Sequence, residues 1–115
     1  MAALTTNVVP NTGLRIDDKF VAAAGGGDTC ETGAGVELHV KNGGGSPVTV
    51  TLGYPGKYDG DQTVSGRTFV VPITTGHTVI PVRDIYRDPA TGRAAITYSG
   101  VTSVTVAVIR GQVTG

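Results

Sequence analysis

Residues that could take part in chemistry are few in this chain. The segment Gly25-Gly-Gly-Asp-Thr-Cys-Glu-Thr-Gly-Ala-Gly35 has the glycines of a phosphate-binding loop, but it lacks the Gly-Lys-Ser/Thr ending that reaches phosphate and magnesium. Cys30 stands beside Glu31, and a neighbouring carboxylate raises a thiol pKa and suppresses the reactive thiolate. We therefore interpret the segment as a flexible turn and Cys30, the single cysteine, as a structural thiol.

Two other groups carry only part of a metal-binding pattern. Asp59-Gly-Asp61 offers two carboxylates, but the further ligands and the bidentate Glu of a calcium loop do not follow, so turn chemistry explains both residues. His39 and His77 lie on separate expected strands beside different neighbours, with no Cys or carboxylate cluster to complete a zinc pattern. The sequence predicts no metal site and no cofactor, and each histidine is expected on the outer face of a strand.

No residue set indicates catalysis. Hydrolysis needs a nucleophile with a base, or two carboxylates across a cleft, and the best-placed carboxylate, Glu37, alternates outward with His39 and Lys41. We therefore predict that the chain is not an enzyme. The segment Arg83-Asp-Ile-Tyr-Arg87 is different, because arginine and tyrosine are enriched in protein interfaces. It indicates either a contact loop or a local salt bridge at the end of a strand.

The elements that must position these residues are β-strands. In Val101–Arg110, Val104, Val106 and Val108 fall on one face and the intervening residues on the other, the two-residue period of a strand. Seventeen valines, seventeen threonines and eighteen glycines among 115 residues favour strands and turns over helices. The composition predicts an all-β domain of ordinary size that needs no disulfide.

Seven expected strands at this spacing predict a single small antiparallel β-sandwich, either jelly-roll or immunoglobulin-like. We expect an extended N-terminal arm over residues 1–18 and the sandwich over residues 19–115. Short turns predict hairpins at Asn42–Pro47 and at Ser99-Gly100, and the aperiodic segment Gly53–Gly66 is expected to be the longest loop. The expected strands are Lys19–Ala23, Val36–Lys41, Val48–Leu52, Thr68–Val71, His77–Val82, Ala94–Tyr98 and Val101–Arg110.

Charge and hydropathy limit the partners. Nine basic and nine acidic residues cancel and are scattered, so no basic patch is available to bind nucleic acid directly. No secretory signal pattern and no long apolar run is found, which predicts a protein made in the cytoplasm with no membrane contact.

Two blocks of the chain resemble small head proteins of tailed phages, particularly those of actinobacteria. The first is Gly35-Val-Glu-Leu-His-Val-Lys-Asn-Gly-Gly-Gly-Ser-Pro-Val-Thr-Val-Thr-Leu52, and the second is Ala94-Ala-Ile-Thr-Tyr-Ser-Gly-Val-Thr-Ser-Val-Thr-Val-Ala-Val-Ile-Arg110. Together they cover about half of the chain, and neither contains catalytic residues to carry over. The resemblance implies a capsid decoration or minor capsid protein, a small β-sandwich that binds the major capsid protein on the exterior of a virion assembled in the host cytoplasm.

The expected function is therefore that of a non-enzymatic capsid component that binds as a homo-oligomer, with a trimer favoured because decoration proteins commonly sit at three-fold positions. A head-to-tail connector or tail protein is the alternative within the same phage setting. A carbohydrate-binding module is a further alternative, although six aromatic residues without tryptophan offer few rings for stacking on sugars. The expected contact residues come from the arm and two loops: Leu4, Val8, Val9, Leu14, Tyr54, Tyr58, Arg83, Tyr86 and Arg87.

Overall fold

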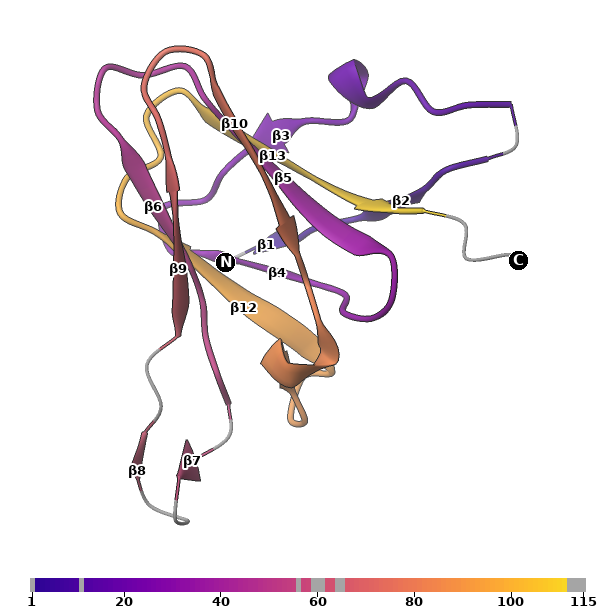
Figure 1. Cartoon of the computed structure of the whole chain (residues 1–115), viewed down its shortest axis with the longest axis vertical. Coiled ribbons are helices and arrows are strands. Elements are labelled where there is room, and N and C mark those ends of the chain that lie inside the picture. The colour runs from indigo at the N-terminus through magenta and orange to yellow at the C-terminus, as the bar shows by residue number, and fades with distance from the viewer. Residues whose placement is uncertain (1, 11, 56, 59–61, 64–65, 112–115) are drawn as a thin grey trace.

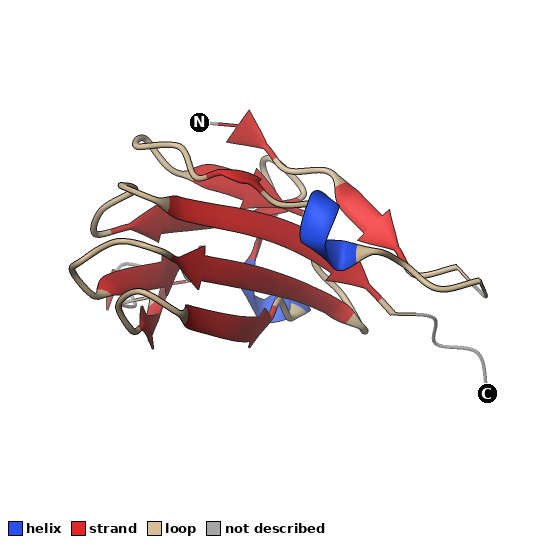
Figure 2. Cartoon of the chain, turned by 90° about the horizontal axis from the view of Figure 1, so that it is seen from above, coloured by secondary structure: helices blue, strands red, loops and turns tan. Residues whose placement is uncertain are grey.

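The computed structural model describes the chain except for residues 1, 11, 56, 59–61, 64–65 and 112–115. Two β-sheets pack face to face, and two single-turn 3-10 helices are the helical elements among the described residues (Figures 1 and 2). The prediction of an all-β sandwich is confirmed.

The first sheet has the strand order β1-β4-β12-β6-β9, and β11 also pairs with β12. Its pairs are antiparallel except for β1 with β4, which is parallel. The central strands β12 and β6 match the expected ranges to within one residue, because each has a clear alternation of apolar and polar side chains. The bounds are β1 Ala2–Ala3, β4 Asp28–Cys30, β6 Val48–Leu52, β9 Arg67–Val71, β11 Arg87–Asp88 and β12 Arg93–Tyr98.

The second sheet has the strand order β10-β5-β13-β2, with β3 pairing beside β13. The long pairs β10–β5 and β5–β13 are antiparallel, whereas β13 and β2 run parallel. The bounds are β2 Thr6–Val8, β3 Val21–Ala22, β5 Val36–Asn42, β10 Gly76–Pro81 and β13 Val104–Arg110. The 3-10 helices are η1, Ile16–Asp18, and η2, Asp84–Tyr86.

The core lies between the inner faces of the two sheets. Every second residue of β5 and of β6 is buried, so the two-residue period of the sequence becomes the inner and outer faces of the sandwich. The largest fully buried side chains come from both sheets and are Leu38, Leu52, Ile80, Ile96, Val36, Val40, Val50, Val71, Val82, Val104, Val106 and Val108.

Both predicted hairpins are wrong. The turn after Tyr98 leads from β12 in the first sheet to β13 in the second, and the turn after Asn42 leads from β5 in the second sheet to β6 in the first. In the immunoglobulin fold, by contrast, the last two strands pair within one sheet. A short Gly-rich turn fits either a hairpin or a corner between packed sheets, so its length alone does not decide between them.

The segment expected to be the longest loop contains a small antiparallel ribbon. Strands β7, Lys57–Tyr58, and β8, Gln62–Thr63, pair with each other beyond the ends of β6 and β9, which are themselves neighbours. Figure 1 shows this ribbon projecting from the sandwich at the lower left. The segment is therefore the extended tip of a hairpin that joins β6 to β9.

The N-terminal segment is extended, as expected, but it is not separate from the sandwich. Strand β1 pairs with β4 and β2 pairs with β13, so the first residues join both sheets. Leu4 lies between these two strands and is 6 % exposed within the core. The division at residue 18 therefore does not separate two structural units, because parallel pairing to distant strands has no local sequence signal.

Strand β4 was not expected. It forms in the segment interpreted as a flexible turn, and it buries Asp28 and Cys30 completely. The Asp28 Oδ2 atom accepts hydrogen bonds from the Tyr98 hydroxyl at 2.7 Å and the Ala24 amide at 3.2 Å. Gly27, at a φ of 96°, turns the chain into the strand so close to β12 that a Cβ atom would lie 2.6 Å from the Ile96 carbonyl oxygen. This corner is ordered by hydrogen bonds and a close backbone approach.

Candidate functional site

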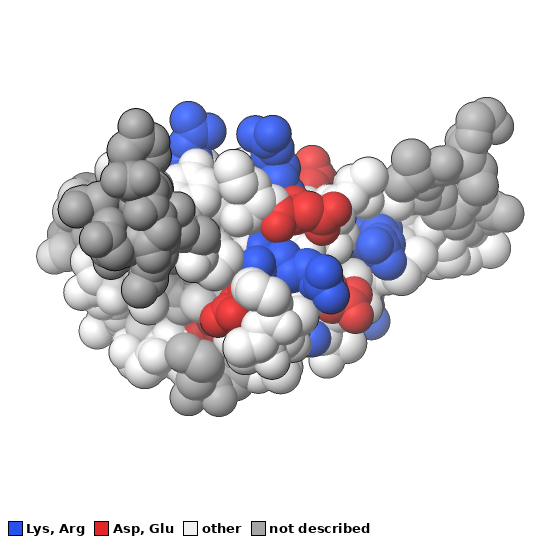
Figure 3. All heavy atoms as spheres, turned by 90° about the horizontal axis from the view of Figure 1, so that it is seen from below, with Lys and Arg blue, Asp and Glu red and all other residues white. Residues whose placement is uncertain are grey.

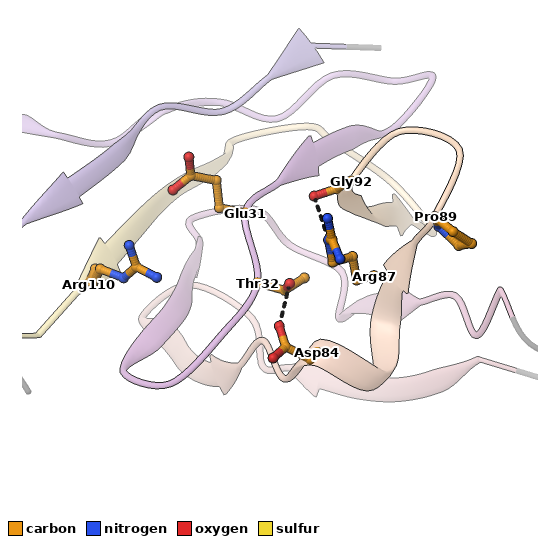
Figure 4. A pocket seen from close by; sticks show the side chains of 7 residues that line it. All are labelled: Glu31, Thr32, Asp84, Arg87, Pro89, Gly92 and Arg110. Carbon is orange, nitrogen blue, oxygen red and sulfur yellow. Dashed lines mark hydrogen bonds between the residues drawn. The ribbon is translucent and has the colours of Figure 1, made fainter.

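An open depression lies where β4, β12 and β13 meet the loop around η2. Its volume is about 620 Å³. Figure 4 shows the side chains that line it, and Figure 3 shows acidic and basic side chains interspersed over the end of the molecule seen from below. The lining residues are Glu31, Thr32, Asp84, Arg87, Pro89, Gly92 and Arg110.

The depression holds charges of both signs that are not paired with one another. The Thr32 hydroxyl donates a hydrogen bond to Asp84 Oδ1 at 2.8 Å, and Arg87 Nε donates to the Gly92 carbonyl at 3.4 Å (Figure 4). Within the described part of the chain, neither Arg87 nor Arg110 lies within 4.0 Å of a carboxylate oxygen. The two guanidinium groups therefore keep most of their donors for an external partner.

Gly33 allows these groups to come together. It has a φ of 132°, and a Cβ atom there would lie 3.4 Å from a terminal nitrogen of Arg110 and 3.9 Å from Asp84 Oδ1. Planar arginine donors beside carboxylate and hydroxyl acceptors suit the recognition of another polar protein surface. This arrangement can bind a polar protein surface through complementary charges and hydrogen bonds.

The predicted contact loop Arg83–Arg87 lies at the rim of the depression, but Tyr86 was wrongly assigned as a contact. Tyr86 is 2 % exposed and belongs to the core, where its ring lies 5.2 Å from the ring of Tyr54. Burial and the neighbouring Tyr54 raise the pKa of Tyr86. The 3-10 turn of η2 points Tyr86 inward and leaves Ile85 outside at 55 % exposure, a direction that the sequence pattern did not reveal.

The remaining predicted contact residues divide by burial. Leu4 is wrong as a contact because it packs in the core, whereas Val8 is 56 % exposed and Val9 and Leu14 are half-buried. Tyr54 is half-buried against the core, and Arg83 and Arg87 are exposed. Tyr58 lies in β7, and Asp59 and Asp61 lie outside the described residues.

Cys30 is inaccessible. Burial raises the pKa of its thiol to about 12, with Glu31 making a smaller contribution in the same direction. The interpretation as a structural thiol agrees with this position, but the main cause is the burial of β4 and not the adjacent carboxylate.

The two histidines lie together, although the sequence placed them beside different partners. Strands β5 and β10 pair so that His39 and His77 are diagonal neighbours on the outer face of the second sheet. His39 Nδ1 lies 3.1 Å from His77 Nε2, and the Phe20 ring is roughly perpendicular to both imidazoles. Burial and His77 lower the pKa of His39, whereas Glu37 raises it. Only the strand register could have revealed this pair.

Comparison with known proteins gives no match to a protein family, a curated protein or a solved structure. Among the described residues, no helix has the length and apolar character needed to cross a membrane. No group of three or more His, Cys, Asp or Glu residues in that part of the chain is arranged to hold a metal ion.

Proposed function

We propose that this chain is a non-enzymatic structural protein of a tailed-phage virion, a decoration or minor capsid protein that binds the major capsid protein on the outside of the head. The observation that carries the proposal is the exposed η2 loop beside the mixed-charge depression. This surface joins an apolar side chain, Ile85, to the guanidinium groups of Arg87 and Arg110, which have no ion-pair partner among the described residues.

The way the η2 loop is anchored supports a role in binding. Tyr86 packs against Tyr54 and holds the loop to the core, so Arg83, Ile85 and Arg87 are held outward on a fixed base. A fixed surface loses little conformational entropy when it binds, and arginine is frequent among the residues that dominate interface energies. The contact loop proposed from the sequence, Arg83–Arg87, is therefore kept in the proposal, with Ile85 in place of Tyr86.

The positions of the two resembling blocks also support the proposal. Gly35–Leu52 contains β5 and β6, and Ala94–Arg110 contains β12 and β13. These four strands occupy the middle of the two sheets. The two resembling blocks thus form the scaffold of the sandwich, whereas the proposed contact loop lies between them in the sequence. Loops vary in sequence more than the strands they connect, so this loop can be specific for one major capsid protein while the scaffold is shared.

An exposed edge of the sandwich supports self-association. Strands β9 and β10 end the two sheets on the same side and are joined by residues 72–75, and the strands together with this connection carry exposed apolar side chains. Val70, Ile73 and Val79 are 62 %, 48 % and 46 % exposed. A closed homo-oligomer, which we propose is a trimer, would cover this edge with a second copy of the chain.

The proposal is tested on purified phage heads that lack tails. We expect the chain on these heads and a trimer in light scattering of the isolated protein. Replacing both Ile85 and Arg87 by Ala should lower head occupancy at least tenfold without changing the circular dichroism spectrum. Lys41→Ala is the matched control, because Lys41 is exposed near the end of β5, whereas the opposite end of β5, at Val36, lies beside Val82 and the η2 loop.

Three outcomes would count against the proposal. Presence of the chain on tailed particles but not on tail-free heads would favour the connector or tail alternative. Unchanged occupancy of the Ile85 and Arg87 double variant would remove the η2 loop from the interface. A monomer at the protein concentration that saturates the heads would reject the trimer.

A further inference from the structure

The outer face of the second sheet carries a pair of imidazoles with the geometry of a metal chelate. His39 Nδ1 and His77 Nε2 are 3.1 Å apart, and their ring planes meet at 56°. Two nitrogen ligands at about 2.05 Å from one ion are separated by about 2.9 Å at a right angle and by about 3.3 Å at a tetrahedral angle. The observed separation lies between these two values.

We propose that His39 Nδ1 and His77 Nε2 bind one divalent ion of the borderline class, Cu²⁺, Ni²⁺ or Zn²⁺, in place of the proton they share. Without the ion, one ring donates an N–H to the other. On binding, that ring releases the proton to water and takes one up from water on its other nitrogen, so it remains a neutral imidazole. Both lone pairs then turn toward the ion by rotation about the Cβ–Cγ bonds, which the broad torsion of imidazole allows.

The surroundings of His39 favour this use of its ring. Glu37 Oε1 lies 3.9 Å from His39 Nε2, the nitrogen that faces away from His77. A carboxylate beside the second ring nitrogen favours a proton at that position and leaves the other nitrogen free as a ligand. The His39 side chain is 13 % exposed, so its neighbours limit the ring to small rotations that keep Nδ1 directed toward His77.

Phe20 closes one side of the pair. Its ring centroid lies 6.5 Å from that of His39 and 5.7 Å from that of His77, both in edge-on geometry. Lys41 Nζ lies 4.8 Å above the Phe20 ring, so this cation is held by the aromatic face. His77 is exposed, which leaves the other side of the ion open to water ligands.

Two protein ligands completed by water make a weak, open site. The order of affinity should follow the general trend for nitrogen ligands, with Cu²⁺ bound more tightly than Ni²⁺ or Zn²⁺. Imidazole ligands without a carboxylate in the inner shell disfavour Mg²⁺ and Ca²⁺, which prefer oxygen.

The test uses the full chain without an affinity tag, labelled with ¹⁵N in the histidine rings and titrated with zinc chloride alone. We expect one ion per chain, with NMR shifts at Nδ1 of His39 and Nε2 of His77. His39→Gln and His77→Gln should each weaken zinc binding at least tenfold in calorimetry. Lys41→Gln is the matched control on the same strand face, and it should bind zinc as tightly as the native chain or more tightly.

The far-UV circular dichroism of all three variants should match that of the native chain, because these side chains lie on the outer face. Zinc affinity unchanged in either histidine variant would overturn the proposal. A shift confined to Nε2 of His39 would do the same, since that nitrogen points to Glu37 and not to His77.

Discussion

Asp28 and Asn42 are both buried at corners of the sandwich, yet their hydrogen bonding differs. Asn42 is 1 % exposed, its Nδ2 donates to the carbonyls of Ser46 and Val71 at 2.8 and 3.3 Å, and its Oδ1 accepts from the Gly44 amide at 2.9 Å. Asp28 is fully buried, and its Oδ1 has no hydrogen-bond partner among the described residues, although its Oδ2 has two.

The difference follows from the chemistry of the two groups. A neutral amide that finds partners for both ends costs little to bury and fixes the path of the chain around it. A carboxylate brings a larger desolvation cost, which two hydrogen bonds to one oxygen offset only in part. The Asn42 corner should therefore depend on its side chain, whereas the Asp28 corner should depend more on the backbone approach at Gly27.

The largest effect is expected for Gly27→Ala. A Cβ atom at Gly27 would lie 2.6 Å from the Ile96 carbonyl oxygen, and the φ of 96° is unfavourable for a residue with a side chain. We expect the free energy of unfolding to fall by about 3 kcal/mol. The matched change at the other corner is Gly44→Ala, where the nearest backbone atom, the Thr102 carbonyl oxygen, lies 2.9 Å away and where φ is not positive.

Urea unfolding followed by circular dichroism measures both variants. Gly44→Ala should cost clearly less than Gly27→Ala. Equal losses of unfolding free energy would show that both corners depend to the same degree on a close backbone approach at their glycines. That result would contradict the proposed difference between the Asp28 and Asn42 corners.

The second prediction concerns the side chains themselves. Asn42→Ala leaves one amide and two carbonyl groups without their partner, and it should cost about 2 to 3 kcal/mol. Asp28→Ala removes two hydrogen bonds instead of three and takes away a buried oxygen that has no described partner, so it should cost about 1 to 2 kcal/mol. The urea midpoints of the two variants, compared at equal denaturation slope, show which substitution lowers the free energy of unfolding more. A larger loss for Asp28→Ala would reverse the proposed difference.

Both corners belong to the part of the fold that the sequence did not reveal. The alternation of Val48, Val50 and Leu52 predicted β6 residue for residue, because the pattern is local. The choice between a hairpin and a crossing to the other sheet depends on distant partners, so the turn after Asn42 was assigned incorrectly. Strand β4 lacked an alternating pattern long enough to predict it, because it has only three residues between glycine-rich segments.

The candidate site was predictable to a similar extent. Composition pointed to the loop around η2 as a contact, and Arg83 and Arg87 of that loop are exposed. The burial of Tyr86 was not foreseen, because the period of a 3-10 turn differs from that of the preceding strand. The meeting of His39 with His77 needs the register of β5 with β10, which no local pattern contains.

High pH should weaken the Asp28 corner, because Tyr98, which bonds to Asp28, and Cys30, in the same strand as Asp28, lose their protons there. Burial, with the hydrogen bond to Asp28, raises the pKa of Tyr98, and burial raises the pKa of Cys30 from its ordinary 9.0 to about 12. A group whose pKa is higher in the folded state stabilises the fold fully below its unfolded pKa, and this contribution is lost as pH rises toward the folded value. Stability should therefore fall above about pH 9, by up to about 1.4 kcal/mol per pH unit for each group.

Urea midpoints between about pH 7 and about pH 11 measure this fall. Cys30→Ala and Tyr98→Phe should each give a shallower decline than the native chain, because each removes one group whose pKa is raised in the folded state. Asn42→Ala is the control, since its side chain does not ionise and its slope should equal the native one. A native chain with constant stability across this range would contradict the prediction.

The smallest effect is expected for Asp28→Asn. An asparagine can keep an oxygen at the position that accepts from Tyr98 and Ala24, and it removes the buried charge. The substitution also weakens two charge-assisted hydrogen bonds and places an amide nitrogen where Oδ1 has no described partner. The stabilising and destabilising effects should therefore nearly cancel, and the free energy of unfolding should change by less than about 1 kcal/mol. Urea unfolding near neutral pH gives the value, and Asn42→Asp is the matched reverse exchange, which should cost more because it removes two donors that have acceptors. If Asp28→Asn is as costly as Asp28→Ala, the carboxylate charge itself holds this corner, and the difference drawn between the two buried groups is wrong.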